Sequence, residues 1–341
     1  SAGPSPSPAL AVASAVPSPS PGLAAVPSPS ASPLPLASPS PAVALAQTPS
    51  DSESEFPFDQ YPFAAMIDNI KAARPQYGLA GADVVYEAPA EGGIPRLMPV
   101  FLRSGVDEKS IGPVRSARHY FVDMANEYRV ALVHIGASPQ GFDALRATGL
   151  PDLDEQRGDP GFTRVRTRVA PHNAFVSTTS VRDALQQRGT TLSPSVGPLR
   201  FGTYAPGPDP ATTIKIDYPG GEHYKVEYHY DAGKQVYNRI MDGQPHTDGA
   251  TGEQYAATSV IIQYADVQPI PNDTVGRIDI TLVGSGTGIL VAEGTQVPLQ
   301  WSKASLDDPT HFERTDGAPF ELPDGQVWIQ IVPLETQLSV T

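Results

Sequence analysis

The chain has 341 residues, of which 23 are Lys or Arg and 37 are Asp or Glu, so its formal net charge at pH 7 is −14. This charge repels phosphate backbones, and we therefore expect no nucleic-acid partner. The absence of Cys excludes disulfides, thiolate zinc sites and iron–sulfur clusters, and we expect no cofactor.

Residues 1–55 form a tail rich in Pro, Ser and Ala. Its first 50 residues contain 13 Pro, 12 Ser and 12 Ala and no charged side chain. Proline blocks helices, and such a run buries little apolar surface, so we predict a disordered or polyproline-like segment. A spacer of this composition that begins without Met is typical of an exported protein, just after a lipidated Cys. We therefore expect an N-terminal lipid anchor at the extracytoplasmic face of a bacterial membrane, and a chain trimmed at an arbitrary place is the alternative.

Residues 56–200 alternate strand and helix patterns, which predicts a mixed α/β domain. Short apolar runs bounded by Gly, Pro or Asn indicate strands buried on both faces, at residues 63–68, 83–88, 94–102 and 130–135. Apolar side chains at helical spacing predict helices at residues 113–128, 139–148 and 179–188. Pro113 suits the first position of its helix. Ser138 stands between a strand and Pro139, where it suits an N-cap better than a nucleophile.

Residues 201–341 follow a different pattern, which predicts a mainly antiparallel β domain. Five prolines within residues 190–212 mark the boundary between the two domains. Beyond them, apolar and polar side chains alternate with a period of two at residues 224–230 and 278–282. Turn signals such as Asp242-Gly243 and Glu293-Gly294 recur at hairpin-like intervals. The whole chain is therefore predicted to be an α+β protein with two domains behind a tail.

Basic side chains gather at the start of the predicted helix 113–128. Arg115, Arg118 and His119 have the spacing i, i+3 and i+4, which places them on one flank of the first helical turn. Cations are disfavoured there by the helix dipole, so a partner should compensate them. A bound anion such as phosphate, a carboxylate or an acidic glycan is one interpretation. An internal ion-pair network with Asp68, Glu87 or Glu91 is the other.

Three further residues are candidates for acid–base chemistry. Glu87 and Glu91 flank a short segment before Gly92-Gly93, and paired carboxylates of this kind can catalyse glycoside hydrolysis. Pairing with Arg96 and Arg115 is the structural alternative. His172 lies in a loop and could act as a general base, or as a metal ligand together with His134. No third ligand stands at metal-site spacing, so we expect no metal site.

These residues belong to a longer pattern that resembles a known family. The pattern is carried by Met66-Ile67-Asp68-Asn69, Ala73-Arg74-Pro75, Ala82-Asp83-Val84-Val85-Tyr86-Glu87, Glu91-Gly92-Gly93, Arg96 and Gly112-Pro113-Val114-Arg115-Ser116-Ala117-Arg118. It is similar to the YerB-type family of predicted bacterial lipoproteins, and the similarity extends from about residue 58 to residue 333. The resemblance implies an extracytoplasmic, lipid-anchored protein of two domains, and it implies no particular reaction.

Two functions are compatible with these observations. The first is a structural or accessory subunit, without catalytic activity, that docks on a membrane protein complex and uses its tail as a strap. The second is a cell-envelope enzyme or binding protein for a small acidic ligand. In that case Arg74, Arg96, Arg115 and Arg118 would bind the anion, and Glu87, Glu91 or His172 would move a proton.

Overall fold

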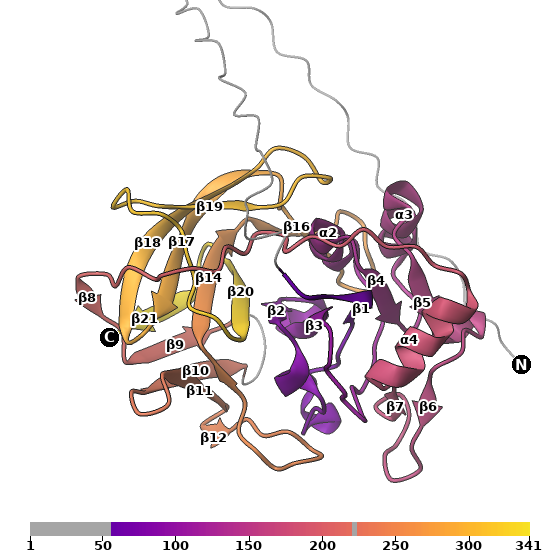
Figure 1. Cartoon of the computed structure of the whole chain (residues 1–341). Helices are drawn as coiled ribbons and strands as arrows, with labels where there is room; N and C mark the ends of the chain where they lie inside the picture. Colours follow the sequence, from indigo (N-terminus) through magenta and orange to yellow (C-terminus); the bar gives the residue numbers. More distant parts are fainter. Residues whose placement is uncertain (1–55, 220–223) are drawn as a thin grey trace, which may run out of the picture. The chain divides into compact units, whose positions relative to one another are not determined.

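Figure 1 shows the computed structural model of the chain, which describes residues 56–219 and 224–341. The tail at residues 1–55 lies outside the described residues, so its disordered or polyproline-like state stays a prediction. The described part contains the α-helices α2 (His119–Tyr128), α3 (Pro139–Thr148) and α4 (Thr178–Gln187). It also contains the short 3₁₀ helices η1 (Lys71–Ala73), η2 (Leu79–Gly81), η3 (Glu91–Gly93) and η4 (Glu155–Arg157). Within these residues, no helix is both long and apolar enough to cross a bilayer.

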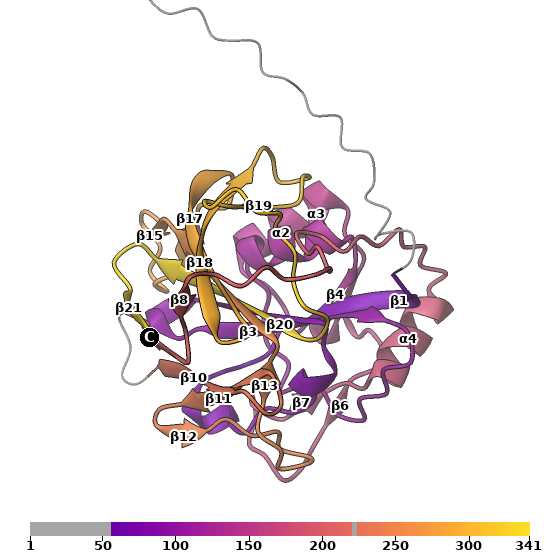
Figure 2. The same cartoon turned by 60° about the vertical axis from the view of Figure 1, so that its left-hand side comes forward.

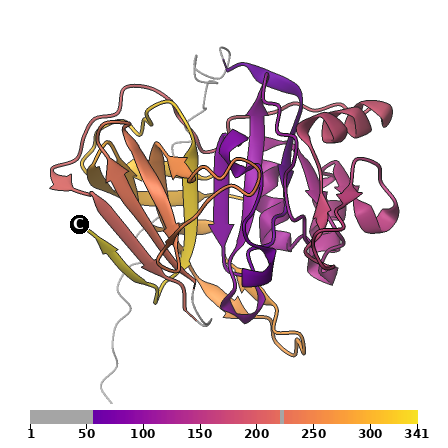
Figure 3. The same ribbon diagram turned by 90° about the horizontal axis from the view of Figure 1, so that it is seen from below.

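The main structural element is one eleven-stranded sheet that runs through both predicted domains. Its strands, in spatial order, are β19 (His311–Arg314), β18 (Thr295–Lys303), β17 (Gly284–Ala292), β14 (Ser259–Ala265), β20 (Val327–Pro333), β2 (Val84–Ala88), β3 (Arg96–Arg103), β1 (Phe58–Ala65), β4 (Ala131–His134) and β5 (Asp152–Asp154), with β8 (Asp209–Pro210) paired to β18. Strand β20 pairs in parallel with β14 on one side and with β2 on the other. The last strand of this sheet in sequence thus joins the two halves, which lie side by side in Figure 3.

Three smaller sheets complete the β structure. A six-stranded sheet contains β12 (Gln244–Pro245), β11 (Val236–Met241), β10 (Lys225–Asp231), β9 (Thr213–Asp217) and β21 (Gln337–Val340), with β13 (Ala256–Ala257) paired to β11. Two hairpins are formed by β15 (Val267–Pro269) with β16 (Ile278–Ile280), and by β6 (Thr163–Arg164) with β7 (Ala174–Phe175). The predicted α+β fold, with a mixed first half and a mainly antiparallel second half, is confirmed. The predicted boundary between residues 56–200 and 201–341 stays a prediction.

The core lies on both faces of the large sheet, as expected for strands without a polar side. Along β1, Phe63 and Ala65 point into one apolar cluster and Ala64 points into the other. Helix α4 and the six-stranded sheet cover the first face. Helices α2 and α3 cover the second face and lie next to each other in Figure 2. Each large apolar side chain buried in this way contributes about 1.5–3 kcal/mol.

The start of α2 differs from the prediction. The helix begins at His119, and Pro113 does not occupy its first turn. The Gly112–Pro113 peptide is cis, and the segment is extended because its backbone forms hydrogen bonds with the residues that follow β1 and β4. The Arg115 amide donates to the Met66 carbonyl, and Ala117 bridges to Ala137. Arg115 therefore does not lie on a helical turn, and Arg118 is the residue just before the helix.

Candidate functional site

Several of the polar residues predicted from the sequence lie at one end of the strands of the large sheet. Strands β1 and β2 are both antiparallel to β3, and β4, β5, β14 and β20 run in the same direction as β1 and β2. The carboxyl ends of all six strands therefore lie on the same side of the sheet, which is where α/β sheets usually bind ligands. Asp68 follows β1, Glu91 follows β2, and Arg96 begins β3. Local strand direction thus explains why residues far apart in the sequence meet here.

Asp68 organises the first cluster at this edge, which we call the Asp68 cluster: Asp68, Arg115 and His172. Asp68 is buried, and its Oδ2 atom is 2.7 Å from His172 Nδ1 and 2.9 Å from Arg115 Nε. His172 follows the cis Ala170–Pro171 peptide in the loop between β6 and β7. Of the two alternatives for Arg115, the structure shows the internal pair with Asp68. The contact is an ion pair only, because the buried Nε atom has no hydrogen-bond partner among the described residues.

Glu91 organises the second cluster. It forms an ion pair with Arg118, and a second one with Arg96 at 3.2 Å. Burial alone would raise the pKa of Glu91, but the hydrogen bond from Arg118 and the charges of both arginines lower it overall. Burial and the nearby charge of Arg118 lower the pKa of Arg96 to about 10. Arg96 Nη1 donates to the Ser116 carbonyl at 2.5 Å, so both terminal nitrogens of Arg96 have partners within the protein.

Glu87 has a different environment from the one expected. It does not pair with Arg96 or Arg115, because its side chain points to the other half of the protein. Its Oε2 atom accepts a hydrogen bond of 2.7 Å from Arg239, and both side chains are fully buried. Burial by itself would lower the pKa of Arg239, but the charge of Glu87 outweighs it and the pKa is raised. Glu87 is therefore a structural anion in this arrangement.

Arg239 is the centre of a buried network that was not predicted from the sequence. Its Nε atom donates to His246 Nδ1 at 3.0 Å, and its Nη1 atom donates to the Tyr228 hydroxyl at 2.5 Å. The guanidinium also lies 4.3 Å from the ring centroid of Trp328. A signal for this residue was present: Arg239 occupies an inward position between Tyr237 and Met241 in the alternating strand β11, where an apolar side chain is expected.

The network also determines the state of His246. Because Arg239 donates to Nδ1, the proton of the neutral ring is on Nε2, which donates to Gln76 Oε1 at 2.7 Å. Burial and the charges of Arg239 and Arg74 hold the pKa of His246 well below its ordinary value. Gln76 in turn donates to Asn69 Oδ1 at 2.9 Å. His246 therefore links the two halves and has no free ring nitrogen for chemistry.

Two other predicted residues have structural roles. The Ser138 hydroxyl accepts a hydrogen bond of 3.0 Å from the Gly141 amide, so Ser138 is the N-cap of α3, as predicted. His134 is buried, with Nδ1 2.9 Å from the Gly136 carbonyl and Nε2 3.0 Å from Asp152. It does not contact His172. Throughout residues 56–219 and 224–341, no three His, Asp or Glu side chains are grouped in a way that could hold a metal ion.

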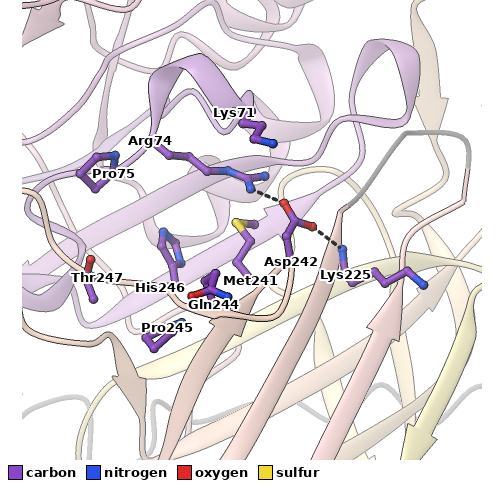
Figure 4. Close-up of a pocket in the computed structure, with 10 residues that line it drawn as sticks. All are labelled: Lys71, Arg74, Pro75, Lys225, Met241, Asp242, Gln244, Pro245, His246 and Thr247. Carbon is purple, nitrogen blue, oxygen red and sulfur yellow. Dashed lines mark hydrogen bonds and ion pairs between the residues drawn. The ribbon is translucent and has the colours of Figure 1, made fainter.

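Arg74 lies apart from the other arginines, in the wall of a cleft of about 710 Å³ between the two halves. The cleft is lined by Lys71, Arg74, Pro75, Lys225, Met241, Asp242, Gln244, Pro245, His246 and Thr247, and Figure 4 shows these side chains. Arg74 Nη1 reaches across to Asp242 at 2.5 Å, and Arg74 Nε donates to the Asn69 carbonyl at 3.2 Å. Its Nη2 atom is buried without a hydrogen-bond partner in the described structure.

The cleft and the Asp68 cluster lie on the same stretch of chain. Residues 68–75 carry Asp68 at one end and Arg74 at the other. Arg168, from the His172 loop, donates to the carbonyls of Ala73 and Pro75 and so fixes that loop against the cleft wall. Burial raises the pKa of the Tyr224 hydroxyl, and the charges of Arg74, Asp242 and Asp68 also act on it. The structure thus brings cationic groups together with a buried carboxylate beside a cavity of ligand size.

The chain can be compared with known proteins on this basis. Residues 48–191 match the family domain described as "Protein of unknown function (DUF3048) N-terminal domain", and residues 214–329 match its C-terminal domain. "Putative lipoprotein YerB" of Bacillus subtilis (strain 168) is 34% identical over 278 residues, which are 81% of this chain and 82% of that protein. The crystal structure of the YerB protein from Bacillus subtilis superimposes with a TM-score of 0.71 at 31% identity, over 82% of this chain and 94% of the other. The resemblance inferred from the sequence motifs is therefore confirmed, and the chain belongs to the DUF3048 family, with both of its domains in order.

Proposed function

We propose that this protein binds an acidic ligand in the cleft, at the extracytoplasmic face of a bacterial membrane to which an N-terminal lipid anchor attaches it. One observation carries the proposal: three cationic side chains line the cleft against a single carboxylate. They are Lys71, Arg74 and Lys225, and the carboxylate is Asp242. In a chain with a net charge of −14, a local excess of positive charge attracts anions to one place.

The partners of these cations support the same conclusion. Lys71 has no ion-pair partner within the described residues, and Arg74 keeps one buried guanidinium donor unsatisfied. A buried donor without a partner is costly, and an ion or ordered water is the usual explanation. Lys225 pairs with Asp217 at 3.3 Å, but both side chains are largely exposed, so this pair is weak and leaves Lys225 able to rearrange.

The size and the lining of the cleft favour a small organic anion over an isolated ion. A volume of about 710 Å³ lies within the range of small-molecule sites. Pro75, Met241 and Pro245 provide apolar surface on which a ring can pack, while Gln244 and Thr247 provide polar groups. An acidic sugar or a phosphorylated sugar has both a charged group and an apolar ring face, so it fits this lining.

Binding measurements with the full chain test this proposal. We expect thermal shifts and calorimetric binding with phosphate, sulfate and glucuronate, weakened by salt because the attraction is electrostatic. The double substitution Lys71→Gln with Lys225→Gln removes two charges without disturbing the Arg74–Asp242 pair. Because the two lost charges are partly screened by solvent, we expect the double variant to bind the anions about tenfold more weakly than the unmodified chain does. The control is Arg146→Gln, whose exposed pair with Asp143 lies on α3. If no anion binds, or if the double variant binds as tightly as the unmodified chain, the proposal is wrong.

The location is supported by the family. The Bacillus subtilis relative has a name that describes a lipoprotein, and residues 1–50 of the present chain have the Pro-, Ser- and Ala-rich composition of a spacer. Intact-mass measurement of the protein from its native membrane would detect a lipidated N-terminus. An unmodified N-terminus would contradict the anchor and leave the cleft proposal to be judged by its own experiment.

Docking on a membrane protein complex is a second candidate. It is inferred from the sequence, and the large aliphatic side chains that it would use are the exposed ones, Val169 at 83%, Val275 at 60% and Leu334 at 64%. The role of the tail as a strap rests on the sequence alone, because those residues lie outside the described part. Co-purification after mild detergent extraction tests this candidate. The same membrane subunits should accompany the protein in a constant ratio, and fewer should accompany a Val169→Asp, Val275→Asp variant. A protein that elutes alone at its own 36.1 kDa would refute docking.

A further inference from the structure

In the Asp68 cluster, a buried carboxylate contacts two side chains, His172 and Arg115, that are partly exposed to solvent. His172 and Arg115 both contact the same Asp68 oxygen, Oδ2. Asp68 Oδ1 is used by the Ile70 amide at 3.2 Å, so the carboxylate cannot rotate freely. The side chains of His172 and Arg115 are 18% and 29% exposed, whereas that of Asp68 is 7% exposed. Asp68 therefore holds two partly accessible side chains in fixed orientations.

The contact with Asp68 determines which proton His172 carries. A carboxylate only accepts hydrogen bonds, so His172 Nδ1 is the donor in the 2.7 Å contact. In the neutral ring the other nitrogen, Nε2, then has a lone pair and no proton. Nε2 has no hydrogen-bond partner among the described residues. It is thus a fixed acceptor, suited to a hydroxyl group that donates a proton to it.

Arg115 presents the complementary chemistry. Its Nε atom lies 2.9 Å from Asp68 Oδ2 in an ion pair and forms no hydrogen bond with a described residue. The charge pair therefore leaves the terminal nitrogens as the groups that can donate to a ligand. Two parallel N–H donors of a guanidinium match the two oxygens of a carboxylate or a phosphate. Because Arg115 and His172 share one Asp68 oxygen, the acceptor for a hydroxyl and the donors for an oxyanion are adjacent.

We infer that the Asp68 cluster is the subsite that recognises a hydroxyl group next to the acidic group of the ligand. The ligand class is then a hydroxylated acid, such as an acidic sugar, and not a simple carboxylic acid. The inference rests on the proposed anion-binding function of the cleft, whose wall, residues 71–75, is contacted by the His172 loop through Arg168. Asp68 acts here as a positioning residue, and His172 and Arg115 are the binding residues.

Two acids of equal ring size and charge test this inference with the full-length protein. Glucuronate has hydroxyl groups on its ring, and cyclohexanecarboxylate has none. Because glucuronate can form one additional hydrogen bond, we expect the unmodified protein to bind it about three- to tenfold more tightly than cyclohexanecarboxylate. His172→Ala should remove this preference by weakening glucuronate alone, and Arg115→Ala should weaken both acids. His172→Gln should retain part of the preference, because its amide oxygen still accepts a hydrogen bond.

The controls separate this inference from the proposal on which it rests. His229→Ala changes an exposed histidine paired with Glu227 and should leave both affinities unchanged. Urea unfolding of each variant shows whether it is folded. Equal binding of the two acids by the unmodified protein, or equal weakening of both by His172→Ala, refutes the hydroxyl subsite and leaves the cleft proposal standing. Failure of both acids to bind while phosphate or sulfate binds refutes this inference alone, and failure of all four ligands refutes the cleft proposal as well.

Discussion

Replacing Glu87 by Gln should strongly destabilise the protein, although the change is nearly isosteric. The substitution removes the negative charge that faces Arg239 at 2.7 Å, where both side chains are fully buried. The guanidinium then keeps its charge with only the neutral partners His246 and Tyr228 and the ring of Trp328 around it. The amide of Gln also directs N–H groups toward other N–H groups.

The size of the effect follows from the desolvation of Arg239. Removing one member of a buried ion pair typically costs about 3–5 kcal/mol, because the remaining charge stays out of water without compensation. For a folded part of this size, the melting temperature should fall on the order of 10 °C. Arg146→Gln provides the comparison, because the pair of Arg146 with Asp143 is exposed and should contribute less than about 1 kcal/mol.

Urea unfolding followed by circular dichroism and Trp fluorescence measures this difference. The network joins residues of both halves, from Asn69 and Glu87 to Arg239, so the two signals should shift together. Trp328 packs directly on the guanidinium and reports on this region. A loss below about 1 kcal/mol, equal to that of Arg146→Gln, would show that Arg239 is hydrated and that the buried-pair reasoning is wrong.

Further predictions concern single groups. Burial raises the pKa of Asp123 to about 6. Between about pH 4 and 6 the native state therefore binds more protons at this group than the unfolded state does. As the pH rises through this range, Asp123 lowers the stability of the fold. In urea titrations Asp123→Asn should be more stable than the unmodified protein at pH 7.5, by up to roughly 3 kcal/mol, and not at pH 4. Burial lowers the pKa of His246 in the native state. As the pH falls below about 6.5, the unfolded state binds a proton at this histidine and the native state does not, so stability is lost. His246→Gln should reduce that loss between pH 7 and 5, and an unchanged slope would contradict the buried neutral ring. Ser138→Ala removes the N-cap of α3 and should cost about 1 kcal/mol, measured as a lower urea midpoint, whereas no change would mean that the cap is not formed in solution.

Elements that depend on local signals were predicted well from the sequence. The helix expected at residues 139–148 is α3 (Pro139–Thr148), because Ser138, Pro139 and Gly149 mark its two ends within the chain itself. The alternation at residues 224–230 is strand β10, since a period of two is a property of the strand alone. In both cases the neighbouring residues contain all the information that the element needs.

Elements that depend on tertiary contacts were not predicted. A proline before an apolar helical pattern indicated a helix start at Pro113, but the residues that follow strands β1 and β4 bind the backbone of residues 115–117 in an extended form. The partners of the arginines were only partly predicted for the same reason. Asp68 and Glu91 were named as candidates, whereas Asp242, which pairs with Arg74, comes from the second half of the chain. A sequence pattern does not specify which distant carboxylate meets which cation.

The central position of β20 has a consequence for how the protein is made. Residues 327–333 fill the gap between β14 and β2, yet they leave the ribosome long after β2 has done so. Until then, β2 has an unpaired apolar edge, which is a site for aggregation with other chains. A nascent chain of this architecture must therefore keep that edge protected until β20 has been synthesised. Premature termination just before Val327 should yield an insoluble fragment instead of a stable first domain.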